Sequence, residues 1–143
     1  MDDLLRPIFY RVANRTTYIS GTQVVEHLEQ YQRNGHLLPT TKFITIDVKN
    51  LYTMIPRGGA LDALYRFCTK YSNNGKIGNL TVHTIIRLAC VVLETNCFVF
   101  DNKYYRQIRG GAMGSPLTMT LANIYMYEWE QTLIQYQQER NEL

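Results

Sequence analysis

Residues 43–56 have the sequence FITIDVKNLYTMIP, and the acid within it is the centre of the interpretation. The run Phe43–Asp47 is short, rich in β-branched residues and ends in a carboxylate, which predicts a buried strand that delivers Asp47 to its edge. A carboxylate in that place can bind a hard cation such as Mg²⁺ while the carbonyl of Val48 reaches the same ion. Asp47 can also be the cap of the following turn, and spacing alone favours this second interpretation.

The segments on either side of this run have the periodicity of helices. Apolar residues recur at helical spacing in residues 2–12, 22–31, 60–71 and 82–93, with Ser20 or Thr22 as a cap of the second segment. Residues 97–100 and 104–108 flank a turn at 101–103 and predict a β-hairpin. A helix is expected from Pro116 to about Gln131, with Leu117, Leu121, Ile124 and Trp129 on a face that supports the sheet. This order of elements predicts an α+β domain that is helix-rich and has a short antiparallel sheet.

A glycine-rich loop separates the predicted hairpin from the last helix. Its small residues allow backbone N–H groups to approach a ligand, and the helix that begins at Pro116 offers its N-terminal dipole to a phosphate. The loop can equally be a flexible connection. A P-loop is excluded, because no Gly-Lys-Ser/Thr triplet is present. The candidate contact residues of the loop are Gly110, Gly111, Met113, Gly114, Ser115 and Pro116.

Composition limits the remaining possibilities. The 143 residues are 45% hydrophobic and 19% charged, which is enough for one domain with a core, and the net charge of +3 permits a polyanionic partner. Cys68, Cys90 and Cys97 lack the spacing of a zinc site, so we expect buried free thiols. No apolar run is long enough to span a membrane, and no basic region precedes an apolar run as in a secretory signal, so we expect an intracellular protein.

Three segments in this order resemble the first two palm motifs of reverse transcriptases, and most of all those of Penelope-like retroelements. They are DVKNLYTMIP at 47–56, YRQIRGGAMGSPL at 105–117 and LANIYM at 121–126, and the similarity extends upstream to LLRPI at 4–8. The resemblance implies part of the fingers and palm of a right-hand polymerase over residues 1–143, with a helical lead-in at 1–40 and a palm segment at 41–143. The palm motifs would lie at 43–56 and 105–126.

The resemblance also implies roles for individual residues. Asp47 and the carbonyl of Val48 would bind the two catalytic Mg²⁺ ions, and Tyr52 would lie beneath the sugar of the incoming dNTP. Gln107 would contact a base edge or the template backbone, and the loop from Gly110 to Pro116 would contact the template base and the nucleotide. Without the resemblance, Tyr52 is a packing residue and Gln107 faces solvent. Arg57, Arg106 and Arg109 are further candidates for phosphate contacts.

Two departures from the family pattern affect the loop and the helix after it. Met113-Gly114 stands where many reverse transcriptases have Gln-Gly, and Thr118-Met119 stands where Ser-Pro is common. A third departure concerns the active site, because no aromatic-x-Asp-Asp segment follows, and the acids Glu128, Glu130, Glu139 and Glu142 belong to a Gln-rich helical stretch that we expect to be solvated.

The resemblance therefore implies a retroelement RNA-directed DNA polymerase, a nucleotidyltransferase that acts in the nucleus on an RNA template, a DNA primer and dNTPs. We expect these 143 residues to be inactive by themselves. Without the hairpin that carries the third motif, the strand at 43–47 would expose an apolar edge. Two other classes remain open: a decayed or co-opted domain that binds nucleic acid without catalysis, and an unrelated α+β structural domain.

Overall fold

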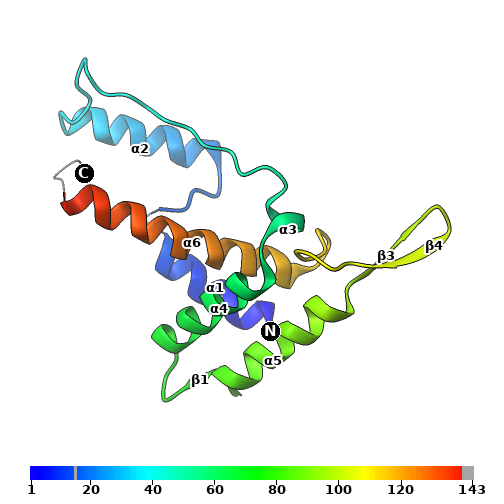
Figure 1. The fold of residues 1–143 in the computed structure, drawn as a ribbon. Helices are drawn as coiled ribbons and strands as arrows, with labels where there is room; N and C mark the ends of the chain where they lie inside the picture. The colour runs from blue at the N-terminus through cyan, green and yellow to red at the C-terminus, as the bar shows by residue number, and fades with distance from the viewer. Residues whose placement is uncertain (15, 140–143) are drawn as a thin grey trace.

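The computed structural model describes residues 1–14 and 16–139, and in that part helices predominate (Figure 1). About 59% of the chain is helical, and the strands form two small antiparallel sheets, which confirms the α+β class. The helices are α1 Asp2–Ala13, α2 Gly21–Arg33, α3 Leu51–Met54, α4 Arg57–Tyr71, α5 Val82–Thr95 and α6 Pro116–Glu139. The strands are β1 Lys76–Ile77, β2 Leu80–Thr81, β3 Cys97–Phe100 and β4 Lys103–Arg106.

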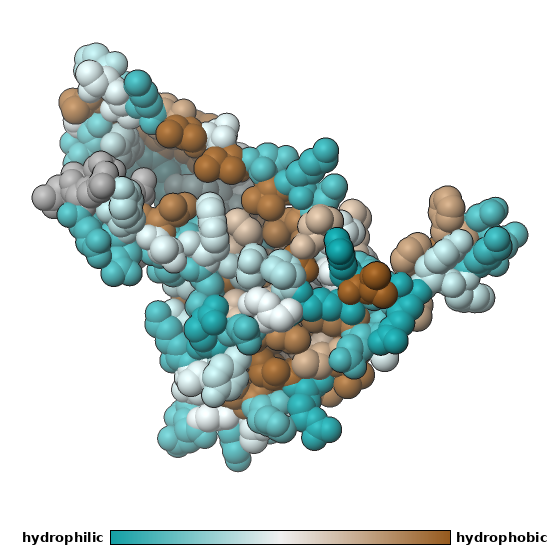
Figure 2. Space-filling model, viewed as in Figure 1, coloured by the Kyte–Doolittle hydropathy of each residue, from teal (hydrophilic) through white to brown (hydrophobic). Residues whose placement is uncertain are grey.

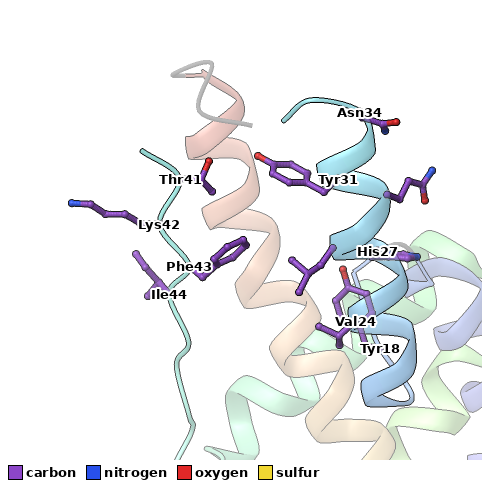
Figure 3. Close-up of a pocket in the computed structure, with 11 residues that line it drawn as sticks. Tyr18, Val24, His27, Tyr31, Asn34, Thr41, Lys42, Phe43 and Ile44 are labelled. Carbon is purple, nitrogen blue, oxygen red and sulfur yellow. The ribbon is translucent and has the colours of Figure 1, made fainter. Parts of the chain in front are cut away.

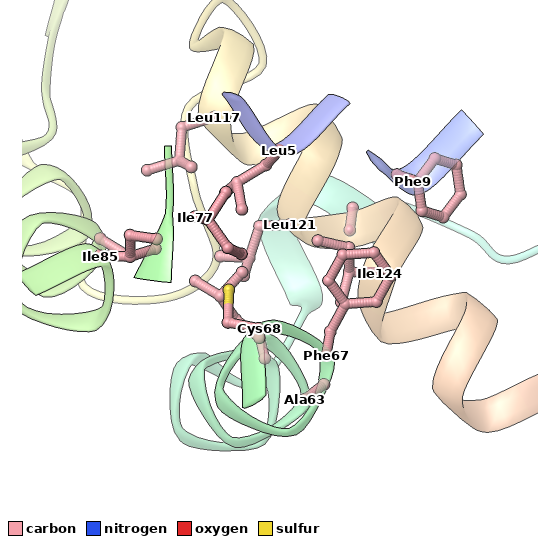
Figure 4. Close-up of a cluster of buried hydrophobic side chains, with 14 of the residues drawn as sticks. Leu5, Phe9, Ala63, Phe67, Cys68, Ile77, Ile85, Leu117, Leu121 and Ile124 are labelled. Atoms are coloured by element: carbon pink, nitrogen blue, oxygen red, sulfur yellow. The ribbon is translucent and has the colours of Figure 1, made fainter. Parts of the chain in front are cut away.

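The core lies where α6 crosses α1 and α4, with α5 packed on the other side of α4 (Figure 4). Leu5 of α1, Phe67 of α4 and Leu121 of α6 are each at most 1% exposed. Rings from three helices also meet there, because Phe9 lies 6.5 Å from Phe67 and 6.2 Å from Tyr127. Burial of each large apolar side chain contributes about 1.5–3 kcal/mol, so this helical junction supplies most of the stability.

The prediction for α6 is wrong in three respects. Leu117, Leu121 and Ile124 are buried as expected, but they pack against helices rather than against a sheet. Trp129 does not share their environment, because 48% of it is exposed. The helix also continues to Glu139, beyond the predicted end near Gln131, because no helix-breaking residue lies between them.

Polar contacts fix the start of α1 and α2. Asp2 accepts hydrogen bonds from Arg6 on its own helix and from Thr120 of α6. Burial alone raises the pKa of Asp2, but these hydrogen bonds outweigh it and hold the pKa below its ordinary value. At α2, Ser20 accepts a hydrogen bond from the amide of Gln23, which confirms Ser20 as the cap.

The predicted buried strand at Phe43–Asp47 is wrong. These residues form no regular element, and Phe43, Ile44 and Ile46 are 65%, 83% and 74% exposed. A strand requires a partner for its N–H and C=O groups, and the strands of the described residues pair only within their own hairpins. High β-propensity by itself is therefore not enough to form a strand here. Residues 43–48 instead form an extended segment with exposed apolar side chains, which we call the apolar strip. Figure 2 shows it as brown patches along the segment between α2 and α3.

The predicted hairpin is confirmed as β3–β4. Its strands pair with Phe98 opposite Tyr105 and Phe100 opposite Lys103. The connection contains only Asp101 and Asn102, with φ of 49° and 55°, because a two-residue turn with two positive φ angles matches the twist of the strands. Two short elements, α3 and the β1–β2 hairpin, were not predicted from the sequence. Helix α3 has four residues and strands β1 and β2 have two each, which is too few to produce a detectable periodicity.

No helix in the described part of the chain is both long and apolar enough to cross a membrane.

A candidate nucleic-acid site at the glycine loop

The fold brings the two motif segments together. The amide of Gly111 donates a hydrogen bond of 2.8 Å to the carbonyl of Tyr52 in α3. The glycine loop, defined here as residues 109–115, therefore packs directly on the helix that follows Asp47 and Val48. Tyr52 is partly buried against the core, so its ring has a packing role whatever else it contacts.

Two positions in the loop require glycine. Gly110 has φ of +58°, and a Cβ there would lie 2.6 Å from the carbonyl oxygen of Thr53. A Cβ on Gly111 would lie 2.7 Å from Cγ2 of Thr118. Both glycines are buried, and the amide of Gly111 is already bonded within the protein, so these residues make the close contact between the loop and α3 rather than an open ligand surface.

Arg57, the first residue of α4, holds the loop from the other side. Its Nε donates to the carbonyl of Gly110 at 2.8 Å, and its Nη2 donates to the carbonyl of Gln107 at 2.7 Å. The sequence analysis proposed Arg57 as a phosphate contact, whereas the structure gives its guanidinium an anchoring role. Sequence reasoning missed this role, because the two carbonyls are about fifty residues away along the chain.

Gln107 joins the hairpin to the loop and does not simply face solvent. Its side-chain amide donates to the carbonyl of Arg109 at 2.9 Å, and its backbone amide donates to the carbonyl of Asn96 at 2.9 Å. Arg106, the last residue of β4, donates to the carbonyl of Glu94 at 3.0 Å. These bonds of Gln107 and Arg106 fix the base of the hairpin. The other N–H donors of the Arg106 guanidinium form no hydrogen bond among the described residues.

The open part of the loop is at Met113 and Gly114. Met113 is 71% exposed, a Cβ added to Gly114 would meet nothing within 4 Å, and Pro116 begins α6 as predicted. Together with Arg106 and Arg109, Met113 and Gly114 border a shallow cavity of about 620 Å³ beside the hairpin. A ligand that reaches the loop meets apolar and backbone groups there, with two guanidinium groups close by.

Asp47 and Val48 are exposed and lie before α3. The cap of α3 is Asn50, which adopts a left-handed conformation with φ of 55° and makes no side-chain cap bond. Among the described residues, Asp47 forms no hydrogen bond or ion pair. The interpretation of Asp47 as a cap of the following turn is therefore wrong, and its carboxylate is free to bind a ligand.

The fit of these residues to Mg²⁺ is partial. A carboxylate and a backbone carbonyl are the oxygen donors that Mg²⁺ prefers, and such a pair suits one ion that arrives with substrate phosphates. Within the part of the chain that the structure describes, no three His, Cys, Asp or Glu side chains lie together as a metal site. The donors of Asp47 and Val48 are too few to hold two ions.

Two acids of α6 differ from the solvated stretch that was expected. Glu128 forms an ion pair of 3.0 Å with Arg66 of α4, and burial raises the pKa of Glu130. Glu139 is exposed, whereas Glu142 lies outside the described residues. Glu128 therefore connects two helices, and the sequence pattern gave no sign of the Arg66 partner.

A second cavity, of about 640 Å³, lies between α2 and the apolar strip (Figure 3). Val24 and Tyr31 of α2 face Phe43 across it, and the ring of Tyr18 packs edge-on against His27 at 5.2 Å. The sequence analysis missed this cavity, because it assigned the strip to a buried strand. Its lining shares no residue with the glycine loop.

No protein-family model, curated protein or solved structure matches the chain.

Proposed function

We propose that this chain forms part of an RNA-directed DNA polymerase of a Penelope-like retroelement, with Asp47 as one metal-binding acid and the glycine loop beside the nucleotide and template. The observation that carries the proposal is the hydrogen bond from Gly111 to Tyr52. It joins two segments that resemble consecutive palm motifs and that are almost sixty residues apart. A polymerase needs its metal-binding acid close to its nucleotide-binding loop, and this bond places the loop against the helix that begins at Leu51, shortly after Asp47.

The roles proposed for the site follow from exposure and hydrogen bonding. Asp47 and the carbonyl of Val48 would hold Mg²⁺, which supplies charge neutralisation at phosphate oxygens. Met113 and Gly114 are open to a base pair and would contact the nucleotide and template together with Ser115 and with Pro116, the first residue of α6. Arg57 keeps the loop in place, so that a ligand meets a preorganised surface.

The second metal-binding acid of the proposed enzyme would have to come from outside the described residues, and this chain alone would be inactive. The direct test is to sequence the transcript and the genomic DNA beyond the codon for Leu143. An open frame with an aromatic-x-Asp-Asp motif soon afterwards supports the polymerase. An immediate stop codon in both sequences contradicts it and favours a domain that no longer catalyses the reaction.

A non-catalytic nucleic-acid-binding domain is the second candidate, because the basic residues beside the loop suit a polyanion with or without catalysis. Binding of an RNA–DNA hybrid separates both candidates from a purely structural domain. We expect binding at low salt that weakens steeply as salt is added, because Lys and Arg contacts release counterions from phosphates. Absence of binding at low salt would support the structural domain. The nucleus is the proposed place of action.

A further inference from the structure

The β3–β4 hairpin projects from the helical body, and both of its faces are open to solvent (Figure 1). Side chains alternate between the faces of a strand, and residues paired across a hairpin lie on the same face. The register therefore places Phe98, Phe100, Lys103 and Tyr105 on one face, which we call the aromatic face. Val99 and Tyr104 lie on the opposite face.

Contacts within the aromatic face hold its rings in order. Phe98 stacks on Tyr105 with 5.5 Å between ring centroids and 17° between ring planes. Phe100 meets the same tyrosine edge-on at 6.4 Å. Cross-strand packing of this kind stabilises a hairpin, which explains the Phe98–Tyr105 pair. It leaves Phe98 and Phe100 50% and 68% exposed, however, and such rings on a projecting ribbon are typical of a binding surface.

The charge around these rings is positive. Lys103 lies on the aromatic face, and Arg109 follows where the hairpin meets the glycine loop, whereas Asp101 in the turn is the one acid of residues 97–109. Arg106 lies at the base of the hairpin on the opposite face. Phe98 also borders the cavity of about 620 Å³ beside the loop. The aromatic face and the loop therefore form one continuous surface, which combines ring faces with cationic groups.

We propose that the aromatic face binds single-stranded nucleic acid, with bases stacked on Phe98 and Phe100 and phosphates near Lys103 and Arg109. Every base has a π face, so ring stacking holds a strand without selecting its sequence, and lysine and arginine attract its backbone. A duplex fits poorly, because its bases are stacked on one another and enclosed. The inference deepens the proposed function, and one part of it rests on that function: the bound strand would be template next to the glycine loop.

The test is the affinity of the 143-residue chain for a fluorescently labelled 20-nucleotide oligouridine, measured by anisotropy at low salt in EDTA. Phe100→Thr removes an exposed ring and keeps a residue with high β-propensity, and we expect it to weaken binding about tenfold. Tyr104→Thr is the matched control, because it removes an 85% exposed ring from the opposite face of the same strand pair. We expect the control to bind within about twofold of the unmodified chain.

Further variants separate stacking from damage to the fold. Phe100→Tyr keeps the ring and should bind like the unmodified chain, and unchanged circular dichroism of Phe100→Thr should show that the helical body is intact. Lys103→Gln should reduce the slope of log affinity against log salt by about 0.7, the value for one phosphate contact on a single strand. An RNA duplex of the same length should compete at least about tenfold less well than oligouridine.

Several results would overturn the assignment: no binding of oligouridine, equal losses from Phe100→Thr and Tyr104→Thr, or equal competition by the duplex. Because EDTA removes any contribution from Mg²⁺, failure of this test leaves the polymerase proposal intact. Conversely, a stop codon directly after Leu143 would contradict the polymerase without changing the affinity that this assay measures.

Discussion

Replacing Gly110 by alanine is the most informative perturbation of the fold, because two separate penalties act at this position. The left-handed backbone costs a residue with a Cβ about 1–2 kcal/mol. The new Cβ would lie 2.6 Å from the carbonyl oxygen of Thr53, which belongs to helix backbone and cannot rotate away, and such overpacking costs about 1–3 kcal/mol. We therefore expect Gly110→Ala to lower the free energy of unfolding by roughly 2–5 kcal/mol.

Urea denaturation followed by circular dichroism measures this loss. With a slope of about 2 kcal/mol per molar urea, the midpoint should fall by roughly 1–2.5 M. Gly114→Ala is the control in the same loop, because nothing lies within 4 Å of its added Cβ, and it should change the free energy by less than about 0.5 kcal/mol. Trypsin should also cut faster after Arg109 in Gly110→Ala. Equal midpoints and equal cleavage rates for the two variants would refute the packing of the loop on α3.

Three further predictions concern the anchor of the loop, an acid and the thiols. Arg57→Met should lower the free energy of unfolding by about 1–3 kcal/mol in urea titrations, because two carbonyls lose a charged donor. The control Arg66→Met breaks an exposed ion pair and should lower it by less than about 1 kcal/mol. Equal losses in the two variants would contradict the anchoring role of Arg57. Burial alone raises the pKa of Asp2, but the hydrogen bonds to its carboxylate hold this pKa below 3.8. The ionised carboxylate should therefore stabilise the fold above pH 3.8, and this contribution to the free energy of unfolding should disappear as the pH falls further. Unfolding titrations from pH 6 to pH 2 should show a loss of stability in the unmodified chain and a smaller loss in Asp2→Asn. Identical pH profiles for the two proteins would be evidence against the role of the Asp2 carboxylate. Burial raises the pKa of Cys68 to about 12, so a thiol reagent at pH 8 should modify exposed Cys97 in the native protein and Cys68 only after unfolding. Modification of Cys68 before Cys97 would rule out the buried position.

The long helices could be predicted from the sequence, because each has apolar residues that recur on one face. The periodic segment at 82–93 became α5, and residue type alone limited the cap of α2 to Ser20 or Thr22, of which the structure shows Ser20. The hairpin was predictable for a similar local reason, since Asp101 and Asn102 tolerate the positive φ angles of its turn.

Features that depend on distant residues could not be predicted. The run Phe43–Asp47 has the composition of a strand, but strand formation depends on a partner that local sequence does not reveal. The anchoring role of Arg57 depends on carbonyl groups, which every residue has, so no residue type identifies them in advance. The contact between Gly111 and Tyr52 agrees with the pairing of the two motifs, whereas the burial of Gly110 and Gly111 was not foreseen.

The central claim is that the carboxylate of Asp47 takes part in nucleotide transfer. The most direct test is primer extension on an RNA template with Mg²⁺ and dNTPs by the longest natural product that contains this chain, compared with its Asp47→Asn and Asp62→Asn variants. Asp62 is an exposed acid of α4 and serves as the matched control. The account predicts extension by the unmodified protein and by Asp62→Asn, and at least a roughly hundredfold loss in Asp47→Asn. Extension that is unchanged in Asp47→Asn, or absent from every protein tested, would contradict it.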